Sequence, residues 1–193
     1  MLGRHAQAEA LAKEVLSLSI DEPLQPLEMW ARPEFVLLCV DTDRIDQAEP
    51  HLERCRDILA AGKDWHGLAG RVARAEAVVA AANGKFDQAQ REFEKAVGIF
   101  RSYDVPYEEA ETLYYWGRAL NAAGEYARAD EKLDGAVAIY RRSEAGPRWI
   151  ERALAAKPSV ASVPSPKRLD TAELQATFRP HDGNWTGFPA CRF

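Results

Sequence analysis

The chain has 193 residues, of which 47% are hydrophobic and 28% are charged, a composition typical of soluble globular proteins. No apolar run approaches the ~20 residues that a transmembrane helix needs. Charged residues interrupt the first fourteen positions, so the apolar core of a secretory signal is missing. We therefore expect a cytoplasmic location. The odd number and wide spacing of the cysteines argue against a disulfide framework or a zinc ribbon.

Charge is divided unevenly along the chain. Residues 1–156 hold 20 Lys and Arg against 27 Asp and Glu, a net charge of −7, whereas residues 157–193 hold 5 against 3, a net charge of +2. An acidic body without a basic face lacks the electrostatic footprint for a phosphate backbone. We therefore expect no direct contact with nucleic acid.

The first element in chain order is an amphipathic stretch at residues 3–19. Its apolar and small residues recur at spacings of three and four, which indicates a helix. The stretch matches the second helix of a helical pair whose first helix is missing. Because an uncapped half-repeat would expose an apolar face, we expect the chain to be a piece of a longer protein.

Residues 23–41 predict the next helical region, with Asp21 as a candidate N-cap. Pro33 complicates this region, because a proline inside a helix removes a hydrogen bond and clashes with the preceding turn. The region is therefore either one kinked helix or two short ones. We expect a break, with Pro33 as the first residue of the better helix.

The amphipathic pattern of the first stretch then returns near residues 43–59, 84–101 and 124–140. In the two clearest copies, the spacing is 40 residues between Gly84 and Gly124. Gly84 is expected to let the preceding helix end in a left-handed conformation. Residues 65–82 and 106–123 predict the helices that lie between these copies, and residues 147–156 predict a short last helix with Trp149, Ile150 and Leu154 as a lid. Self-similarity at this period indicates a solenoid, in which each unit is covered by its neighbours.

The composition changes at Lys157. Residues 157–170 are rich in proline and serine and offer little apolar surface, as in a linker. Residues 171–193 are interpreted as the truncated start of a following domain or as a disordered tail. Residues 1–156 are therefore expected to form the helical repeat domain.

The repeated motif resembles a known family. The series Gly84, Phe86, Ala89, Phe93 and Ala96 is similar to the second half of the tetratricopeptide repeat (TPR). The first half is best seen in Leu113, Trp116, Gly117 and Leu120, which precede Gly124. In this arrangement Gly117 and Ala129 are expected where the two helices touch. This resemblance implies an all-α fold, a TPR-like right-handed superhelical solenoid of antiparallel helix pairs with about three full repeats plus one half-repeat.

The interval of 40 residues is longer than the usual TPR period of about 34. It resembles the long repeats in the helical region of large bacterial multidomain ATPase regulators of the maltose-regulon activator or adenylate-cyclase-associated type. That resemblance implies a role in signal transduction within a larger protein. The chain itself contains no G-x-x-x-x-G-K-[ST] and no G-x-G-x-x-G motif, so any ATPase would lie outside it and no cofactor is expected.

One pair of residues has the spacing of metal ligands on a helix. His51 and Cys55 are four residues apart, a spacing that can place two ligands together. No third or fourth ligand lies near them in the sequence, so we expect no metal site, and Cys55 is interpreted as a small buried hydrophobe.

A candidate partner-binding groove follows from the repeat register. In TPR-like proteins the first helix of each pair lines a concave groove, and the register places Arg74 level with Tyr114. Side chains off the apolar stripe could accept an acidic peptide or helix through bidentate carboxylate bonds. Alternatively, the arginines pair with Glu76, Glu111 and other local acids as a solvated face. The groove set is Arg71, Arg74, Tyr114, Arg118 and Asn121.

These sequence features lead to three hypotheses about function. The first is a non-catalytic protein-binding scaffold or regulatory module within a larger ATP-dependent signalling or transcriptional regulator. The second is a free-standing TPR adaptor protein. The third, an enzyme, lacks a recognisable constellation of nucleophile, base and metal ligands. The expected partner is a protein or peptide, acidic if the arginines bind it, or another domain of the parent protein, and neither nucleic acid nor a membrane.

Overall fold

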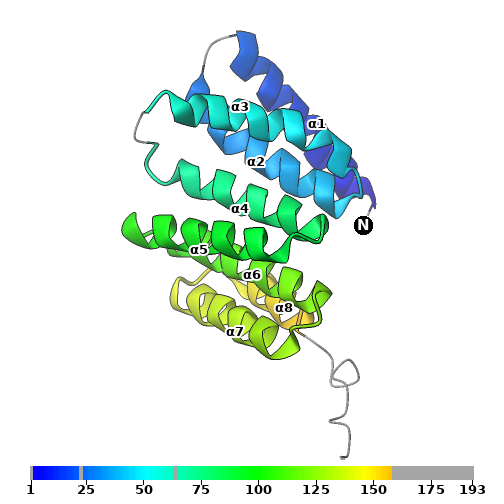
Figure 1. Ribbon diagram of the computed structural model, residues 1–193, viewed down its shortest axis with the longest axis vertical. Helices are drawn as coiled ribbons and strands as arrows, with labels where there is room; N and C mark the ends of the chain where they lie inside the picture. The colour runs from blue at the N-terminus through cyan, green and yellow to red at the C-terminus, as the bar shows by residue number, and fades with distance from the viewer. Residues whose placement is uncertain (1, 22–23, 63–64, 158–193) are drawn as a thin grey trace, which may run out of the picture. The chain divides into compact units, whose positions relative to one another are not determined.

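The computed structural model describes residues 2–21, 24–62 and 65–157 (Figure 1). These residues are helical throughout apart from short connections, so the predicted all-α class is confirmed. The chain divides into two units, Met1–Ser159 and Val160–Phe193. Residues 158–193 lie outside the described residues. The interpretation of residues 157–170 as a linker, and of residues 171–193 as a truncated domain or a tail, therefore stays a prediction.

Eight α-helices and one short 3-10 helix make up the described part. Their bounds are α1 Leu2–Asp21, α2 Gln25–Asp41, η1 Ile45–Gln47, α3 Glu49–Ala60, α4 Leu68–Ala82, α5 Phe86–Ser102, α6 Pro106–Ala122, α7 Tyr126–Arg142 and α8 Pro147–Ala155. We call α2, α4 and α6 the first helices, and α1, α3, α5 and α7 the second helices. The repeated pattern predicts second helices that begin near residues 5, 46, 86 and 126. The starts at Phe86 and Tyr126 are confirmed, whereas α1 begins three residues earlier and α3 three residues later than expected.

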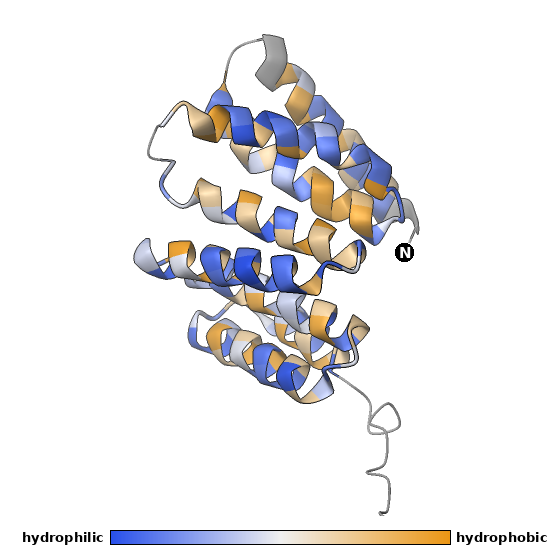
Figure 2. Cartoon of the chain, viewed as in Figure 1, coloured by the Kyte–Doolittle hydropathy of each residue, from blue (hydrophilic) through white to orange (hydrophobic). Residues whose placement is uncertain are grey.

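The helices pack in the order of the chain. Each first helix contacts the second helix that follows it, in the pairs α2 with α3, α4 with α5 and α6 with α7. Each second helix also contacts the helix that follows it in the chain; for example, α1 contacts α2 and α7 contacts α8. The first helices contact one another directly, α2 with α4 and α4 with α6. Figure 2 shows hydrophobic and hydrophilic residues alternating along these helices.

The same turn ends each first helix. Asp43, Gly84 and Gly124 follow these helices in the left-handed conformation, with φ of 58°, 73° and 79°. The next backbone N–H then donates to the carbonyl oxygen five residues earlier, which satisfies a carbonyl at the helix end. These bonds are Arg44 to Cys39 at 2.8 Å, Lys85 to Ala80 at 2.9 Å and Glu125 to Leu120 at 2.9 Å. The predicted helix end at Gly84 is confirmed.

The expected break at Pro33 is wrong. Helix α2 runs unbroken from Gln25 to Asp41 with Pro33 inside it. A proline in a helix costs ~3 kcal/mol, but α2 is packed against α1, α3 and α4 and buries apolar side chains on both sides of Pro33. Burying several such side chains at ~1.5–3 kcal/mol each outweighs the local cost.

Two other sequence expectations need correction. Helix α4 begins at Leu68 rather than at Trp65, because Gly67 just before it has a left-handed φ of 87°. The short last helix begins at the expected Pro147 and ends at Ala155, one residue before the expected end, and Trp149 and Ile150 pack against the main core. Leu154 does not act as a lid, since it is 43% exposed.

Helices α6 and α7 approach each other closely at Gly117. A Cβ atom built on Gly117 would lie 2.6 Å from Cγ of Leu133 and 3.2 Å from the backbone oxygen of Ala129. The predicted contact between Gly117 and Ala129 is therefore confirmed. Only a residue without a side chain fits at Gly117, since atoms of a packed core cannot move apart freely.

We predict that Gly117→Ala lowers the free energy of unfolding by ~1–3 kcal/mol, because the added methyl group overpacks the contact with Leu133. The matched control is Gly98→Ala in α5, where an added Cβ meets no atom within 4 Å. That substitution should stabilise by up to about 1 kcal/mol through helix propensity. Urea unfolding of both variants measures the difference, and equal effects of the same sign would contradict the assigned contact.

Candidate functional site

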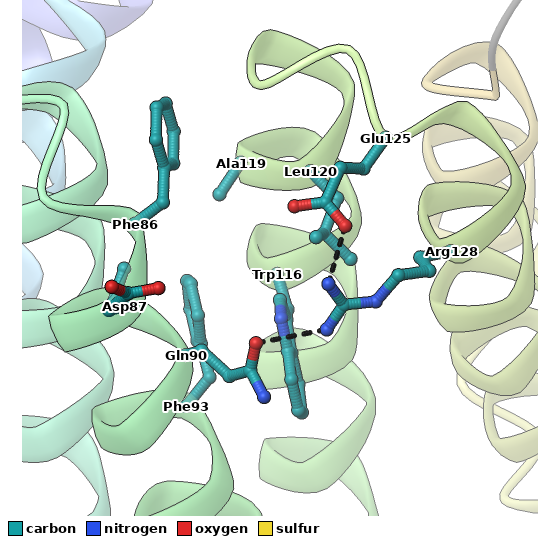
Figure 3. A pocket seen from close by; sticks show the side chains of 10 residues that line it. Phe86, Asp87, Gln90, Phe93, Trp116, Ala119, Leu120, Glu125 and Arg128 are labelled. Carbon is teal, nitrogen blue, oxygen red and sulfur yellow. Dashed lines mark hydrogen bonds and ion pairs between the residues drawn. The ribbon is translucent and has the colours of Figure 1, made fainter.

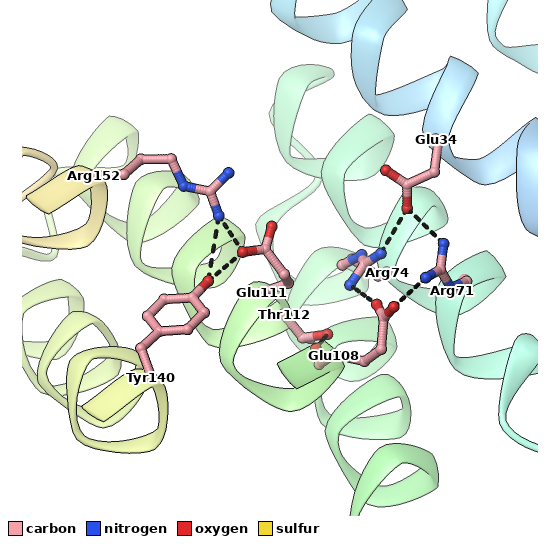
Figure 4. Close-up of polar contacts among 8 residues, drawn as sticks. All are labelled: Glu34, Arg71, Arg74, Glu108, Glu111, Thr112, Tyr140 and Arg152. Carbon is pink, nitrogen blue, oxygen red and sulfur yellow. Dashed lines mark hydrogen bonds and ion pairs between the residues drawn. The ribbon is translucent and has the colours of Figure 1, made fainter. Parts of the chain in front are cut away.

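A buried ionic network joins the three first helices (Figure 4). It consists of Glu34 on α2, Arg71 and Arg74 on α4, and Glu108 on α6. Arg74 donates from Nη1 to Oε2 of Glu108 at 2.7 Å and from Nη2 to Oε1 of Glu34 at 2.9 Å. Arg71 donates to the same Glu34 oxygen at 3.1 Å and also pairs with Glu108. Each carboxylate therefore bridges both arginines.

Burial makes this network sensitive to the loss of Arg74 or Glu108, whereas the Glu34 side chain is 42% exposed. Arg74 is only 2% exposed and Glu108 only 7% exposed. Burial by itself disfavours the charged guanidinium, but the carboxylates of Glu34 and Glu108 outweigh it and raise the pKa of Arg74. Two positive and two negative charges leave the network neutral, so its members have little net charge to offer a partner.

A second cluster joins α6, α7 and α8 (Figure 4). The carboxylate of Glu111 accepts hydrogen bonds from the Tyr140 hydroxyl and from Arg152. Burial and the nearby Glu111 raise the pKa of Tyr140, so the hydroxyl keeps its proton. The Arg152 guanidinium also lies 4.1 Å from the centre of the Tyr114 ring. These contacts fasten the short last helix to the preceding pair.

The predicted groove arginines all lie in internal ion pairs. Arg71 and Arg74 pair with Glu34 and Glu108, as described above. Arg118 donates from Nη2 to Oδ1 of Asp41 at 2.9 Å. The alternative interpretation of the sequence holds only in that the arginines pair with acids. The acids are not Glu76 or Glu111, they lie on other helices, and Arg74 is buried rather than part of a solvated face.

The remaining predicted residues are also engaged. Tyr114 is 8% exposed and lies under Arg152. Asn121 donates from Nδ2 to the backbone oxygen of Ala156 at 2.7 Å. Of the five predicted groove residues, Arg118 is the exposed one, since Arg71 and Asn121 are half-buried. Binding of a partner by the whole set stays a prediction, and Arg74 could take part only if its present ion pairs were broken.

An open hollow lies beside Arg118 and was not predicted from the sequence. Its volume is ≈ 160 Å³, and it lies where α2, α4 and α6 end. Alanine recurs at the same register in Ala82 and Ala122, and this repeated small residue was the available sequence signal. The hollow is lined by Val40, Asp41, Val78, Ala81, Ala82, Tyr115, Arg118, Ala119 and Ala122.

A smaller hollow of ≈ 80 Å³ lies between α5, α6 and α7 (Figure 3). Its wall includes the parallel stack of Phe93 on Trp116, whose ring centres are 5.6 Å apart. Arg128 closes the rim, since it donates to Gln90 at 3.0 Å and also pairs with Glu125. The bridge across its rim makes it a poorer docking site than the hollow beside Arg118.

The candidate metal ligands have other environments. The Nδ1 atom of His51 lies 3.3 Å from Nη1 of Arg32. Cys55 is fully buried, and burial raises the pKa of its thiol to about 12. In residues 2–21, 24–62 and 65–157, no group of three or more His, Cys, Asp or Glu side chains is placed to hold a metal ion. No helix in that same part of the chain has the length and apolar character needed to cross a membrane.

Comparison with known proteins gives no further guide to this site. No protein family matches the chain, and no curated protein or solved structure matches it significantly. The resemblance to tetratricopeptide repeats therefore rests on the motif residues themselves.

A third ionic cluster ties α2 to α3. Glu28 is 2% exposed and accepts from Nη2 of Arg54 at 2.8 Å and from Nε of Arg32 at 2.8 Å. The hydrogen bond from Arg54 lowers the pKa of Glu28, burial opposes this shift, and the bond from Arg32 adds to it. Because the pKa is lower in the folded state, the stabilisation is present above the unfolded pKa and is lost as pH falls through the folded value.

We predict that Glu28→Gln is destabilising at pH 7, because two arginines lose their carboxylate. The variant should also show a smaller loss of stability than the parent chain as pH falls below about 4.3, the unfolded glutamate pKa. Urea unfolding between pH 7 and pH 3 measures both effects. Glu53→Gln on the exposed side of α3 is the control, and an equal pH dependence for Glu28→Gln and the parent would contradict the assignment.

We predict that Arg74→Met destabilises by ~3–5 kcal/mol, because it breaks a buried ion pair. The double variant Arg74→Met with Glu108→Gln should cost less than the sum of the two single changes, with a coupling of ~1–3 kcal/mol. Arg101→Met, which removes an exposed pair with Glu109, should cost ~1 kcal/mol or less. Strict additivity at Arg74 and Glu108 would show that the network is not cooperative.

Proposed function

We propose that this chain is a non-catalytic protein-binding scaffold, a TPR-like right-handed superhelical solenoid that serves as a regulatory module of a larger ATP-dependent signalling or transcriptional regulator. Three features support the proposal. The first helices end in the same turn, the helix contacts repeat from pair to pair, and buried ion pairs hold neighbouring first helices together. A fixed row of helices suits a role in which one surface is presented to a partner.

The observation that carries the proposal is the open apolar hollow beside Arg118. Three first helices contribute to it, and the side chain of Arg118 is 42% exposed at its rim. Half-buried Tyr115 also lines the hollow. Arginine, tryptophan and tyrosine are the residues that dominate binding energy at protein interfaces.

The partner chemistry follows from the lining of the hollow. Alanine and valine side chains accept a single apolar side chain, for which ≈ 160 Å³ is sufficient. One guanidinium N–H of Arg118 is bonded to Asp41, and a guanidinium has five N–H donors in all. The proposed partner is thus a peptide or helix with an apolar side chain next to a carboxylate.

We predict that Ala82→Phe and Arg118→Glu each reduce partner capture by about tenfold or more, since a residue at the centre of an interface contributes ~2 kcal/mol or more. Ala82 is exposed, so filling the hollow should leave the fold intact, as circular dichroism would verify. Partners captured by the parent chain are quantified by mass spectrometry, with Lys95→Glu on α5 as the charge-matched control. Equal capture by all four proteins would exclude this face as the binding surface.

A further inference from the structure

One face of α1 carries an apolar row that the described residues leave open. Ala8, Leu11, Val15 and Leu18 follow one another at spacings of three, four and three, the seam spacing of paired helices. Leu11 is 61% exposed and Leu18 is 59% exposed, and Ala8 is exposed as well. The row borders the flank of α1 that faces α2, where Leu16 is buried and Ala12 and Val15 pack against the same cluster. Val15 is therefore half-buried, and the exposed members of the row are Ala8, Leu11 and Leu18.

The repeat register shows what covers this row elsewhere in the chain. The residues equivalent to Ala8 in α3, α5 and α7 are 0%, 3% and 0% exposed. In each case the first helix of the same pair covers them, with a small residue in the middle of the contact. The equivalents of Ala8 are Ala48, Ala89 and Ala129, and the facing small residues are Val36, Ala77 and Gly117.

Leu11 differs in character from its equivalents. His51 in α3 packs on the Phe35 ring with centres 4.6 Å apart, and Lys132 in α7 lies 4.6 Å from the centre of the Trp116 ring. Both contacts reach an aromatic residue that directly precedes the facing residue, Val36 or Gly117. The third equivalent, Glu92 in α5, instead pairs with Lys95. Leucine at this register in α1 fits the same aromatic contact and makes the row more apolar.

Glu14 adds a charge requirement. It occupies the register of Arg54 in α3, and Arg54 bonds Glu28 on the covering helix α2. Glu28 lies eight residues before the small residue Val36. Since the sign is reversed at Glu14, the helix that covers α1 should carry a lysine or arginine at that position.

We propose that α1 is a second docking surface, which binds an amphipathic helix of a partner protein. That helix carries a basic residue, then six intervening residues, then an aromatic residue, and directly after the aromatic residue a small one. The open row continues the interface that joins first and second helices within each pair. In this binding mode an amphipathic helix packs against an apolar face. The surface on α1 is independent of the hollow beside Arg118.

The probe is a synthetic peptide with the sequence of residues 106–123, fluorescein-labelled and carrying Glu109→Lys. It supplies the required order of residues, because Trp116 and Gly117 are preceded by position 109. Fluorescence anisotropy against the full chain should show saturable binding. The unaltered peptide should bind about three- to fivefold more weakly, because Glu109 would face Glu14, and Glu14→Lys in the protein should invert this order.

Three variants test the surface itself. Leu11→Glu with Leu18→Glu should weaken binding about tenfold or more, since two buried leucines are lost. The matched control, Ala10→Glu with Ser17→Glu, places the same charges on another exposed side of α1 and should leave binding unchanged. Gly117→Leu in the peptide should abolish binding, because it blocks the close approach.

Other outcomes overturn the proposal. Absence of saturable binding by the Glu109→Lys peptide, or binding that persists unchanged in the double leucine variant with native circular dichroism, would refute it. Sedimentation equilibrium provides a separate check. A dimer of the parent chain that the double leucine variant dissociates would show that a second copy, and not a partner helix, covers α1.

Discussion

The buried ion pairs of Arg74 are the constraint on which the arrangement of the first helices depends. One guanidinium on α4 reaches a carboxylate on α2 and another on α6. A charge buried to this degree is tolerated only when it is paired, because removing it from water is costly. The three helices must therefore keep a relative position in which Glu34 and Glu108 both reach Arg74, and this requirement is much stricter than hydrophobic burial alone.

The contacts at one register position show how neighbouring helices recognise each other. Trp30, Arg71, Glu111 and Arg152 occupy equivalent places in successive helices. Arg71 lies 4.9 Å from the centre of the Trp30 ring, and Arg152 pairs with Glu111. The junctions α2–α4 and α6–α8 therefore use different complementary pairs, which favours one order of stacking over others, since wrong neighbours would bring unmatched groups together.

The ion pairs between the first helices limit which side chains are exposed for the proposed partner binding. Arg71 and Arg74 are engaged in ion pairs within the fold, so the proposed partner binding has to use the groups that stay exposed, Arg118 among them. The remaining features are the hollow beside Arg118 and the open row on α1. The first offers an apolar recess with a charged rim, and the second offers a helix face with the same register as the interior contacts of the repeat.

Local spacing in the sequence determined the helical pairs, the helix end at Gly84 and the contact at Gly117, because each depends on residues a few positions apart or on the repeat interval. Tertiary structure decided the rest. Pro33 stays within α2 because packing on both sides outweighs a local cost. The acids that pair with Arg71 and Arg74 lie 34 to 40 residues away. Their choice depends on how each helix is rotated against the next, which no pattern along one helix specifies.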